Sequence, residues 1–269
     1  MGGDQVPQLS PLSMSKSSKS NNCFSLCVIF DKYSIDSILI NFCHFSYNKE
    51  KKIYVLNGGK KMKVRNIFKH FWLITRHKYY VFKYCMKAGL IWQGITHDLS
   101  KYSPTEFWES VKHYDGTKSP IDVCKQKYGY SMAWFHHRGR NRHHYEYWQD
   151  NFDQGGNPVK MPFRFALEMV CDYLGAGQAY SRKNFTYESE YAWWENKKAK
   201  PLAMHPDTKG FVDTMLKLLT EYPEDRILPK KYARRIYDLC TGHVQEDLIR
   251  KQIETDWEDS KKEWRLNQT

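Results

Sequence analysis

The sequence has no hydrophobic run long enough to span a membrane and no secretory leader. A spanning helix needs about 20 consecutive apolar residues, and the most apolar stretch, residues 23–45, is interrupted by Asp31, Lys32 and Asp36. The N-terminal residues lack the basic segment followed by an apolar stretch that marks a signal peptide. The seven cysteines are odd in number and widely spread, which does not fit a disulfide framework. We therefore expect a cytoplasmic protein in a reducing compartment, with no membrane partner.

Familiar catalytic motifs are also missing. The chain has no Gly-rich phosphate-binding loop and no Gly-x-Ser-x-Gly nucleophile elbow. The run Gly175-Ala176-Gly177 falls within a predicted helix, where it indicates close packing. Cys171 is interpreted as a core residue rather than a nucleophile acting with Asp172, because adjacent residues on a helix point about 100° apart. These absences argue against P-loop, α/β-hydrolase and cysteine chemistry.

The composition predicts a packed protein with a basic surface. Hydrophobic residues make up 41% of the chain and aromatic residues 16%, enough for a sizeable core. Lys and Arg total 42 against 30 Asp and Glu, a net charge of +12. This balance favours anionic partners such as phosphates or nucleic acid without selecting one, and it also serves solubility.

The chain changes in character near residue 61. Residues 1–61 include a Ser/Asn/Lys-rich tract and show no sustained helical period, so we expect a poorly structured extension. Gly58-Gly59-Lys60-Lys61 stands directly ahead of Met62 and can be encoded by a purine-rich stretch resembling a bacterial ribosome-binding site. One hypothesis is that Met62 is the natural start; the alternative is a genuine flexible arm. Mass spectrometry of the native protein would distinguish them.

From Met62 onward the pattern predicts an all-α protein, with a helical core over 62–182 and a C-terminal helical region over 183–269 that packs on it. Apolar residues recur at three- and four-residue steps from Val64. Ser103-Pro104-Thr105-Glu106 is typical of a helix start with a capping box. A loop is expected at 138–141 and a turn at 153–158, with no alternating strand and no repeat. Helices are expected at 64–86, 91–101, from 104, and at 121–136, 143–150, 162–180, 188–197, 208–222 and 230–257.

The residues that could carry chemistry are histidines and aspartates. Ten of the eleven histidines lie after residue 61. Divalent metals favour mixed imidazole and carboxylate ligands, and a helical bundle can supply them from facing helices. Asp172 falls in the middle of a predicted helix, where a metal would compensate a buried carboxylate; alternatively it faces solvent or pairs with an arginine. The candidates fall on separate predicted helices or helix ends: His77, His97-Asp98, His136-His137, His143-His144 and Asp172.

These residues resemble a known pattern. Residues 96–101, THDLSK, are similar to the His-Asp-x-Gly/Ser-Lys signature of the HD-domain metal-dependent phosphohydrolase superfamily, and EMVCD, residues 168–172, resembles its closing helix. More narrowly, HDLSKYSPTEF, NRHHYEYW and MVCDYLGAG resemble a bacterial and phage family of unknown function with an HD-like core. The resemblance covers residues 68–180. It implies an HD-like helical bundle with a metal site between its helices.

The resemblance also implies a ligand set. His77, His97 and Asp172 would bind one ion, with Asp98 as a carboxylate shared by two ions if two bind. His137 and one of His143 and His144 would supply further ligands, the other member of each pair packing or hydrogen bonding. His70 is a rival to His77. One or two divalent ions are implied, and Mn, Fe, Co and Zn all suit these donors.

The implied activity is hydrolysis of a phosphoester or nucleotide by a metal-activated water. Lys101 would bind substrate phosphate, and Asn141 would orient a histidine or water. Glu168, one turn before Asp172, would act as a general base or support a ligand. An arginine cluster would clamp phosphate at the mouth of the site, although such a loop is often merely solvated. The cluster consists of Arg138, Arg140 and Arg142.

Three alternatives stay open. The same ligand order occurs in HD-fold di-iron oxygenases. A finding of bound iron without phosphatase activity would favour this alternative. The basic charge and the aromatic residues also suit a non-catalytic nucleic-acid-binding module, since aromatic rings stack on bases. Third, the histidines would hold a single structural zinc in a closed site. The aromatic residues in question are Trp134, Tyr145, Tyr147, Trp148, Trp193 and Trp194.

Overall fold

The computed structural model describes the backbone of residues 44–47, 53–57 and 60–266, and the side chains of residues 63–262. Eleven α-helices dominate this part of the chain, so the predicted all-α class is confirmed. None of them is long and apolar enough to cross a membrane. The helices are α2 (Val64–Lys87), α3 (Ile91–Thr96), α4 (Pro104–His113), α5 (Pro120–Tyr128), α6 (Met132–Arg140), α7 (Phe163–Ser181), α8 (Tyr187–Lys198), α9 (Pro206–Glu221), α10 (Glu224–Ile227), α11 (Lys230–Thr241) and α12 (Glu246–Leu266).

Most of the predicted extension, including the Ser/Asn/Lys-rich tract, lies outside the described residues. The remainder contains a small antiparallel sheet that the sequence did not predict, with Val55 paired to Met62. Its strands are β1 (His44–Tyr47), β2 (Ile53–Asn57) and β3 (Lys60–Lys63), in the order β1-β2-β3.

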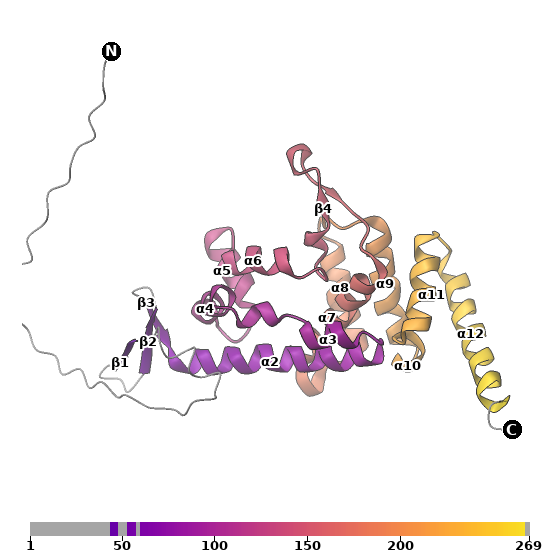
Figure 1. Cartoon of the computed structure of the whole chain (residues 1–269), viewed down its shortest axis with the longest axis horizontal. Helices are drawn as coiled ribbons and strands as arrows, with labels where there is room; N and C mark the ends of the chain where they lie inside the picture. The colour runs from indigo at the N-terminus through magenta and orange to yellow at the C-terminus, as the bar shows by residue number, and fades with distance from the viewer. Residues whose placement is uncertain (1–43, 48–52, 58–59, 267–269) are drawn as a thin grey trace, which may run out of the picture. The chain divides into compact units, whose positions relative to one another are not determined.

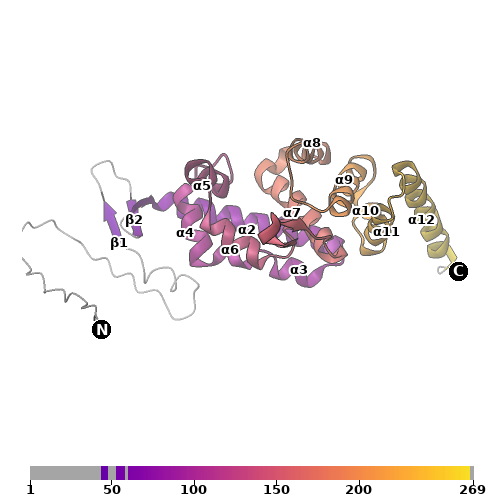
Figure 2. The ribbon, with the colours of Figure 1, turned by 90° about the horizontal axis from the view of Figure 1, so that it is seen from above.

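Helix α7 forms the centre of the helical region. It lies between α2 and α9 in both views (Figures 1 and 2), and residues 166–175 are all buried. Gly175 allows α2 and α7 to approach closely, because a Cβ there would overlap the side chain and backbone of Val81. The close packing predicted for Gly175-Ala176-Gly177 is therefore confirmed. This contact brings the inner faces of α2 and α7, with His77 and Asp172, together.

The second predicted helix, 91–101, ends early. Helix α3 stops at Thr96, Asp98 adopts a left-handed backbone with φ 53°, and a short 3-10 helix, η1 (Leu99–Tyr102), follows. The Nζ of Lys78 donates to the carbonyl oxygens of Ile95 and His97, at 2.5 and 2.9 Å, and so satisfies groups that the interrupted helix leaves free. Both His97 and Asp98 are buried at this break, and the left-handed backbone of Asp98 sets the direction of its side chain.

The single helix predicted over 121–136 is two helices. Gly129, with φ 81°, ends α5, and the hydroxyl of Ser131 caps α6 by accepting from the backbone N–H of Trp134 at 3.0 Å. Helix α6 extends to Arg140, so Arg138 and Arg140 lie on a helix rather than in the predicted loop.

The prediction of a helix over 143–150 is also wrong. His144 has an extended backbone, and the segment continues as one 3-10 turn and a small hairpin. The turn predicted over 153–158 is confirmed, with Gly155 and Gly156 both at positive φ. These elements are η2 (Tyr145–Tyr147), β4 (Gln149–Asp150), η3 (Phe152–Gln154) and β5 (Asn157–Pro158).

The C-terminal helices share the core of α7. The Tyr237 hydroxyl of α11 donates to the carbonyl of Met161 at 2.7 Å, and its ring packs against Phe163 and Phe211. A 3-10 turn, η4 (Arg182–Asn184), leads from α7 towards α8. The helix predicted over 230–257 is interrupted after α11, where His243 has φ 55°.

Candidate metal centre

Asp98 lies at the centre of the buried histidines. Its Oδ2 is 3.1 Å from Nε2 of His77 and 3.3 Å from Nε2 of His97. Its Oδ1 is 3.2 Å from Nε2 of His137 and 3.3 Å from Nε2 of His143. Each oxygen of one carboxylate therefore faces its own pair of imidazoles. The left-handed backbone at Asp98 makes this arrangement available, and Asp is among the residues that tolerate that conformation best.

The first group of candidate ligands joins α2, the turn after α3, and α7. It comprises His77, His97, Asp98 and Asp172, whose candidate ligand atoms all lie within 4.8 Å of one another. Oδ1 of Asp172 is 3.2 Å from Nε2 of His77 and 3.3 Å from Nε2 of His97. All four residues are buried. Two imidazoles and two carboxylates form a donor set that suits a divalent transition metal.

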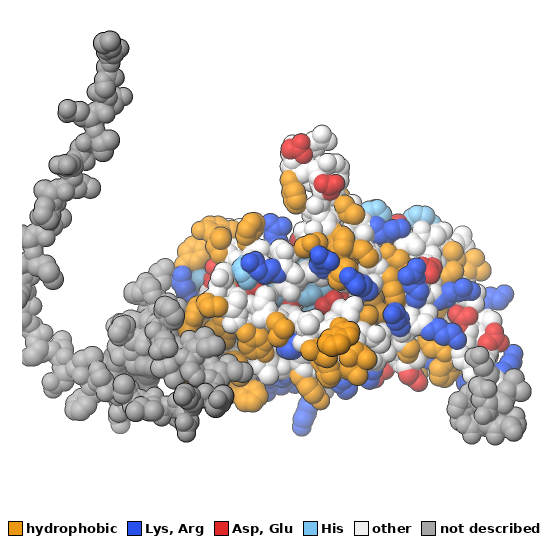
Figure 3. Space-filling model, viewed as in Figure 1, with side chains coloured by type: hydrophobic (Ala, Val, Ile, Leu, Met, Phe, Trp, Pro, Cys, Tyr) orange, Lys and Arg blue, Asp and Glu red, His pale blue; other side chains and the backbone are white. Residues whose placement is uncertain are grey.

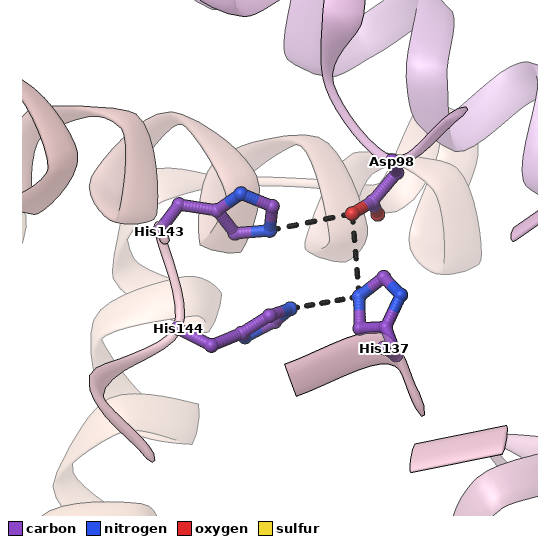
Figure 4. A group of neighbouring side chains, drawn as sticks. All are labelled: Asp98, His137, His143 and His144. Carbon is purple, nitrogen blue, oxygen red and sulfur yellow. Dashed lines mark hydrogen bonds and ion pairs between the residues drawn. The ribbon is translucent and has the colours of Figure 1, made fainter. Parts of the chain in front are cut away.

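The second group joins the same turn, α6 and the segment before η2. Asp98, His137, His143 and His144 point toward one another in Figure 4, with their candidate ligand atoms again within 4.8 Å. Nε2 of His144 lies 2.8 Å from Nε2 of His137. Both members of the His143-His144 pair thus face the centre, whereas only one had been expected to do so.

The tautomers of two histidines are set by Glu168. Its Oε1 lies 3.1 Å from Nδ1 of His97 and 3.2 Å from Nδ1 of His143. Since a carboxylate only accepts, each Nδ1 carries the hydrogen in these bonds, so when a ring is neutral, as a metal ligand must be, its lone pair is on Nε2. The Nε2 atoms of both rings and Oδ1 of Asp98 are buried without a hydrogen-bond partner among the described residues. Two of these atoms, Oδ1 of Asp98 and Nε2 of His143, lie 3.3 Å apart, and a cation bound between them would satisfy both.

The electrostatics of the centre also favour positive charge. Burial by itself would raise the pKa of Asp98, but His97, Lys101 and His137 outweigh it and hold this pKa well below its usual range. Burial likewise opposes ionisation of Asp172, whose pKa is nevertheless lowered by His77 and His97. Burial would lower the pKa of His97, yet the surrounding carboxylates, Asp98 foremost, raise it. Both aspartates are therefore anionic and create a field that stabilises a cation.

Glu106 supports the second group and was missed as a site residue. Its Oε2 is 2.7 Å from Nδ1 of His137, and its Oε1 is 2.6 Å from Nδ1 of His136. The sequence had placed Glu106 in a capping box. Its backbone N–H does bond to the Ser103 hydroxyl, at 3.5 Å, but its side chain turns to the histidines. A glutamate three residues after a capping serine fits both roles, so spacing alone could not distinguish them.

Two smaller polar groups hold the turn after α6. The Asn141 amide donates to the Ser100 hydroxyl at 2.9 Å and to the carbonyl of His137 at 2.8 Å. The Ser100 hydroxyl is also 3.2 Å from Nδ1 of His137. These contacts tie η1 to α6 beside the second group.

His70, the rival to His77, lines the cavity beside the centre but belongs to neither group of candidate ligands. Its ring packs against Phe107 and Tyr114, with centroids 5.3 and 6.0 Å away. Burial, with a smaller effect from Lys101, lowers its pKa to about 4, so His70 is neutral.

One family profile matches the chain. It covers residues 66–218, more than half of the sequence, and describes a family of unknown function, DUF5662. The chain belongs to this family. No curated protein and no solved structure matches it. The DUF5662 match includes every candidate ligand described above and the whole of α8.

A cavity of about 250 Å³ opens onto this DUF5662 centre. His77, His137, His144 and Asp172 line it together with Lys101, whose Nζ is 2.6 Å from Oδ2 of Asp98. Burial would lower the pKa of Lys101, but Asp98 raises it, so the ammonium stays charged. Aliphatic side chains and the carboxylates of Glu106 and Glu146 also line the cavity, together with five aromatic residues, Trp134, Tyr145, Tyr173, Tyr180 and Trp193.

The three predicted phosphate-clamping arginines are not among the residues that line this cavity. Arg138 and Arg140 border a separate hollow with Phe135. The guanidinium of Arg142 lies 5.8 Å from the ring centroid of Tyr147. On the face drawn in Figure 3, Lys and Arg side chains are interspersed with hydrophobic ones, so basic charge is not confined to the cavity. Helix α6 continues through Arg140 and places Arg138 and Arg140 beside this second hollow, whereas Arg142 follows the end of the helix. Phosphate binding by these arginines stays a prediction.

Proposed function

We propose that this protein is a metal-dependent phosphohydrolase whose centre binds two divalent ions. One observation carries the proposal: the two oxygens of Asp98 face two separate pairs of histidines. A carboxylate so placed can bridge two ions, with His77, His97 and Asp172 around one and His137, His143 and His144 around the other. Two-metal centres of this kind favour phosphoryl-oxygen chemistry.

Bound divalent ions supply Lewis acidity and a water of lowered pKa. The chain's own residues perform the remaining work. Glu168 accepts from Nδ1 of His97 and His143, and Glu106 from Nδ1 of His137, which turns the Nε2 atoms of these rings toward the ions they would hold. Lys101, at the cavity wall, turns from Asp98 to an oxygen of the substrate phosphate.

The proposed substrate is a small phosphomonoester or a nucleotide. The cavity volume and its aromatic lining suit a small molecule with an apolar or ring-containing portion. The aromatic residues that suggested nucleic-acid stacking give that alternative less support, because Trp194 is fully buried and Trp134, Tyr145 and Trp193 line the cavity.

The test combines elemental analysis with a phosphoester panel on wild type, Asp98→Ala and His243→Ala. His243 is a matched control because it is an exposed histidine outside both ligand groups. We expect metal and phosphatase activity in wild type and His243→Ala, and loss of both in Asp98→Ala. Unchanged metal content in Asp98→Ala would refute the proposal. Bound iron with visible absorption and no phosphatase activity would favour a di-iron oxygenase instead.

A further inference from the structure

Lys197, near the end of α8, extends into the same cavity and has no carboxylate partner. Its Nζ donates to the Tyr173 hydroxyl at 3.2 Å. The ammonium also lies 4.6 Å from the ring centroid of Tyr173, 5.1 Å from that of Trp193 and 5.5 Å from that of Tyr145. Within residues 63–262 no carboxylate forms an ion pair with it. Three rings therefore position a cation whose charge is not neutralised by direct contact.

Acidic residues are available close to Lys197, although none of those that the structure describes forms an ion pair with it. The adjacent Lys198 forms ion pairs with both Glu195 and Asp213. Burial lowers the pKa of Lys197, and Glu146 and Asp172 compensate for this only in part. A partly desolvated ammonium with donors to spare gains strongly from an anion placed beside it.

The two lysines of the cavity differ in how far their charge is compensated. Lys101 contacts Asp98 directly, at 2.6 Å, so its charge is matched within the protein. Lys197 is in direct contact with a phenol and aromatic faces, while Glu146 and Asp172 act on its ammonium without forming an ion pair. Of these two cations, Lys197 is therefore the one that can bind an anion without giving up an ion pair within the protein.

We propose that Lys197 is a substrate-binding residue that donates hydrogen bonds to an anionic phosphate oxygen, while Tyr145, Tyr173 and Trp193 hold its ammonium in position. This inference rests on the proposed function, because the phosphorylated substrate is the ligand. It adds a residue from the C-terminal helical region to a site whose metal ligands all come from residues 77–172. Substrate recognition then depends on α8, which lies outside the stretch that carries the HD-like motifs.

The experiment measures the dissociation constant of inorganic phosphate by titration calorimetry. Wild type is compared with Lys197→Met, Lys197→Arg and Lys200→Met, each as purified and after chelation of metal. Lys200 is the matched control because it is an exposed lysine close by on the same segment. We expect Lys197→Met to weaken phosphate binding about tenfold or more, as one charge-assisted hydrogen bond is lost. Lys197→Arg should recover most of the affinity, and Lys200→Met should match wild type.

Thermal unfolding of the same variants separates binding from folding. Removal of an incompletely compensated buried charge should leave the unfolding temperature of Lys197→Met equal to or above that of wild type. Loss of phosphate binding at equal or higher stability supports a ligand-binding role. If Lys197→Met unfolds, the comparison is made with Lys197→Gln. Equal phosphate affinity in wild type and the neutral variant, or no phosphate binding by wild type, overturns the inference.

Hydrolysis of 4-nitrophenyl phosphate and metal content, measured on the same samples, distinguish this inference from the proposed function. A normal metal content and activity with a KM insensitive to Lys197→Met would reject the role of Lys197 alone. Phosphate binding that depends on Lys197 in a protein without phosphatase activity would reject the hydrolase proposal alone. The expected result is a raised KM with kcat little changed, because Lys197 holds the substrate without contacting the metal ligands.

Discussion

Glu106 and His137 form a 2.7 Å hydrogen bond that links α4 to the metal centre. The glutamate accepts from Nδ1 and so leaves Nε2 of His137 available to a cation beside Asp98. His77, by contrast, has Nε2 contacts to Asp98 and Asp172 and belongs to the first group. Only some of the candidate histidine ligands donate from Nδ1 to a carboxylate. Substitution of Glu106 therefore tests one ligand group without changing the other.

Glu106→Gln should weaken metal binding at the second group by about 10- to 100-fold, the usual effect of removing a carboxylate behind a histidine ligand. The neutral glutamine side chain no longer fixes the His137 tautomer by its charge. The residues of the first group are unchanged, so the affinity of that group for metal should stay the same. Metal titration with a competing chelator measures the two affinities. The exposed Glu188→Gln serves as control. Unaltered affinity in Glu106→Gln would show that this hydrogen bond does not tune the centre.

Asp172→Ala and His144→Ala should each reduce the metal stoichiometry by one ion per chain, whereas Asp98→Ala should remove both. The reason is that Asp172 belongs only to the first group and His144 only to the second, while Asp98 belongs to both. Elemental analysis of the purified variants gives the stoichiometry. Identical metal loss in all three would contradict two distinct ions.

Gly175→Ala should destabilise the fold by about 1–3 kcal/mol, the usual cost of overpacking a filled core. The new Cβ would overlap Val81 of α2, and both backbones are held in the core. Gly210→Ala in α9 is the matched control, since its Cβ would meet nothing within 4 Å. That change should stabilise by about 0.5–1 kcal/mol through helix propensity. Urea unfolding measures both, and opposite signs are expected.

The free energy of unfolding should fall as the pH rises towards 8 because of Glu190. Burial and the charge of Asp172 raise the pKa of Glu190 to about 8, and Lys197 opposes the shift. The tyrosines near it, Tyr84 and Tyr173, have raised pKa values and stay neutral in this range. Between the ordinary glutamate value and 8 the folded state holds a proton that the unfolded state has released. Stability is therefore lost at about 1.4 kcal/mol per pH unit at most.

Glu190→Gln should remove the contribution of Glu190 to this pH dependence, since the amide does not titrate, and should leave the contribution of His97, whose raised pKa acts in the same direction. Chemical unfolding at pH 5, 6, 7 and 8 measures how the free energy of unfolding changes with pH in wild type and variant. The two slopes should differ by at most about 1.4 kcal/mol per pH unit. Glu188→Gln on the exposed side of α8 should leave the slope unchanged. A wild-type slope that survives Glu190→Gln would assign the effect to other groups.

Much of the local structure followed from nearby residues. Apolar spacing predicted α2 almost to the residue, and the Pro162–Tyr180 prediction corresponds to α7. The predictions were wrong where the end of a helix depends on a single residue or on contacts with residues far away in the sequence. Gly129 splits a predicted helix, and Lys78 from α2 satisfies the carbonyls freed at His97.

The sequence by itself determined the helical class and the stock of imidazole and carboxylate groups, because periodicity and residue chemistry are local properties. Only the tertiary structure decided which of these groups meet. It turned Glu106 inward, gave Asp98 its left-handed backbone, brought both His143 and His144 to the centre, and placed Arg138 beside a separate hollow. Side-chain convergence depends on how the helices pack and where their axes break, and that is settled by contacts between residues far apart in the chain.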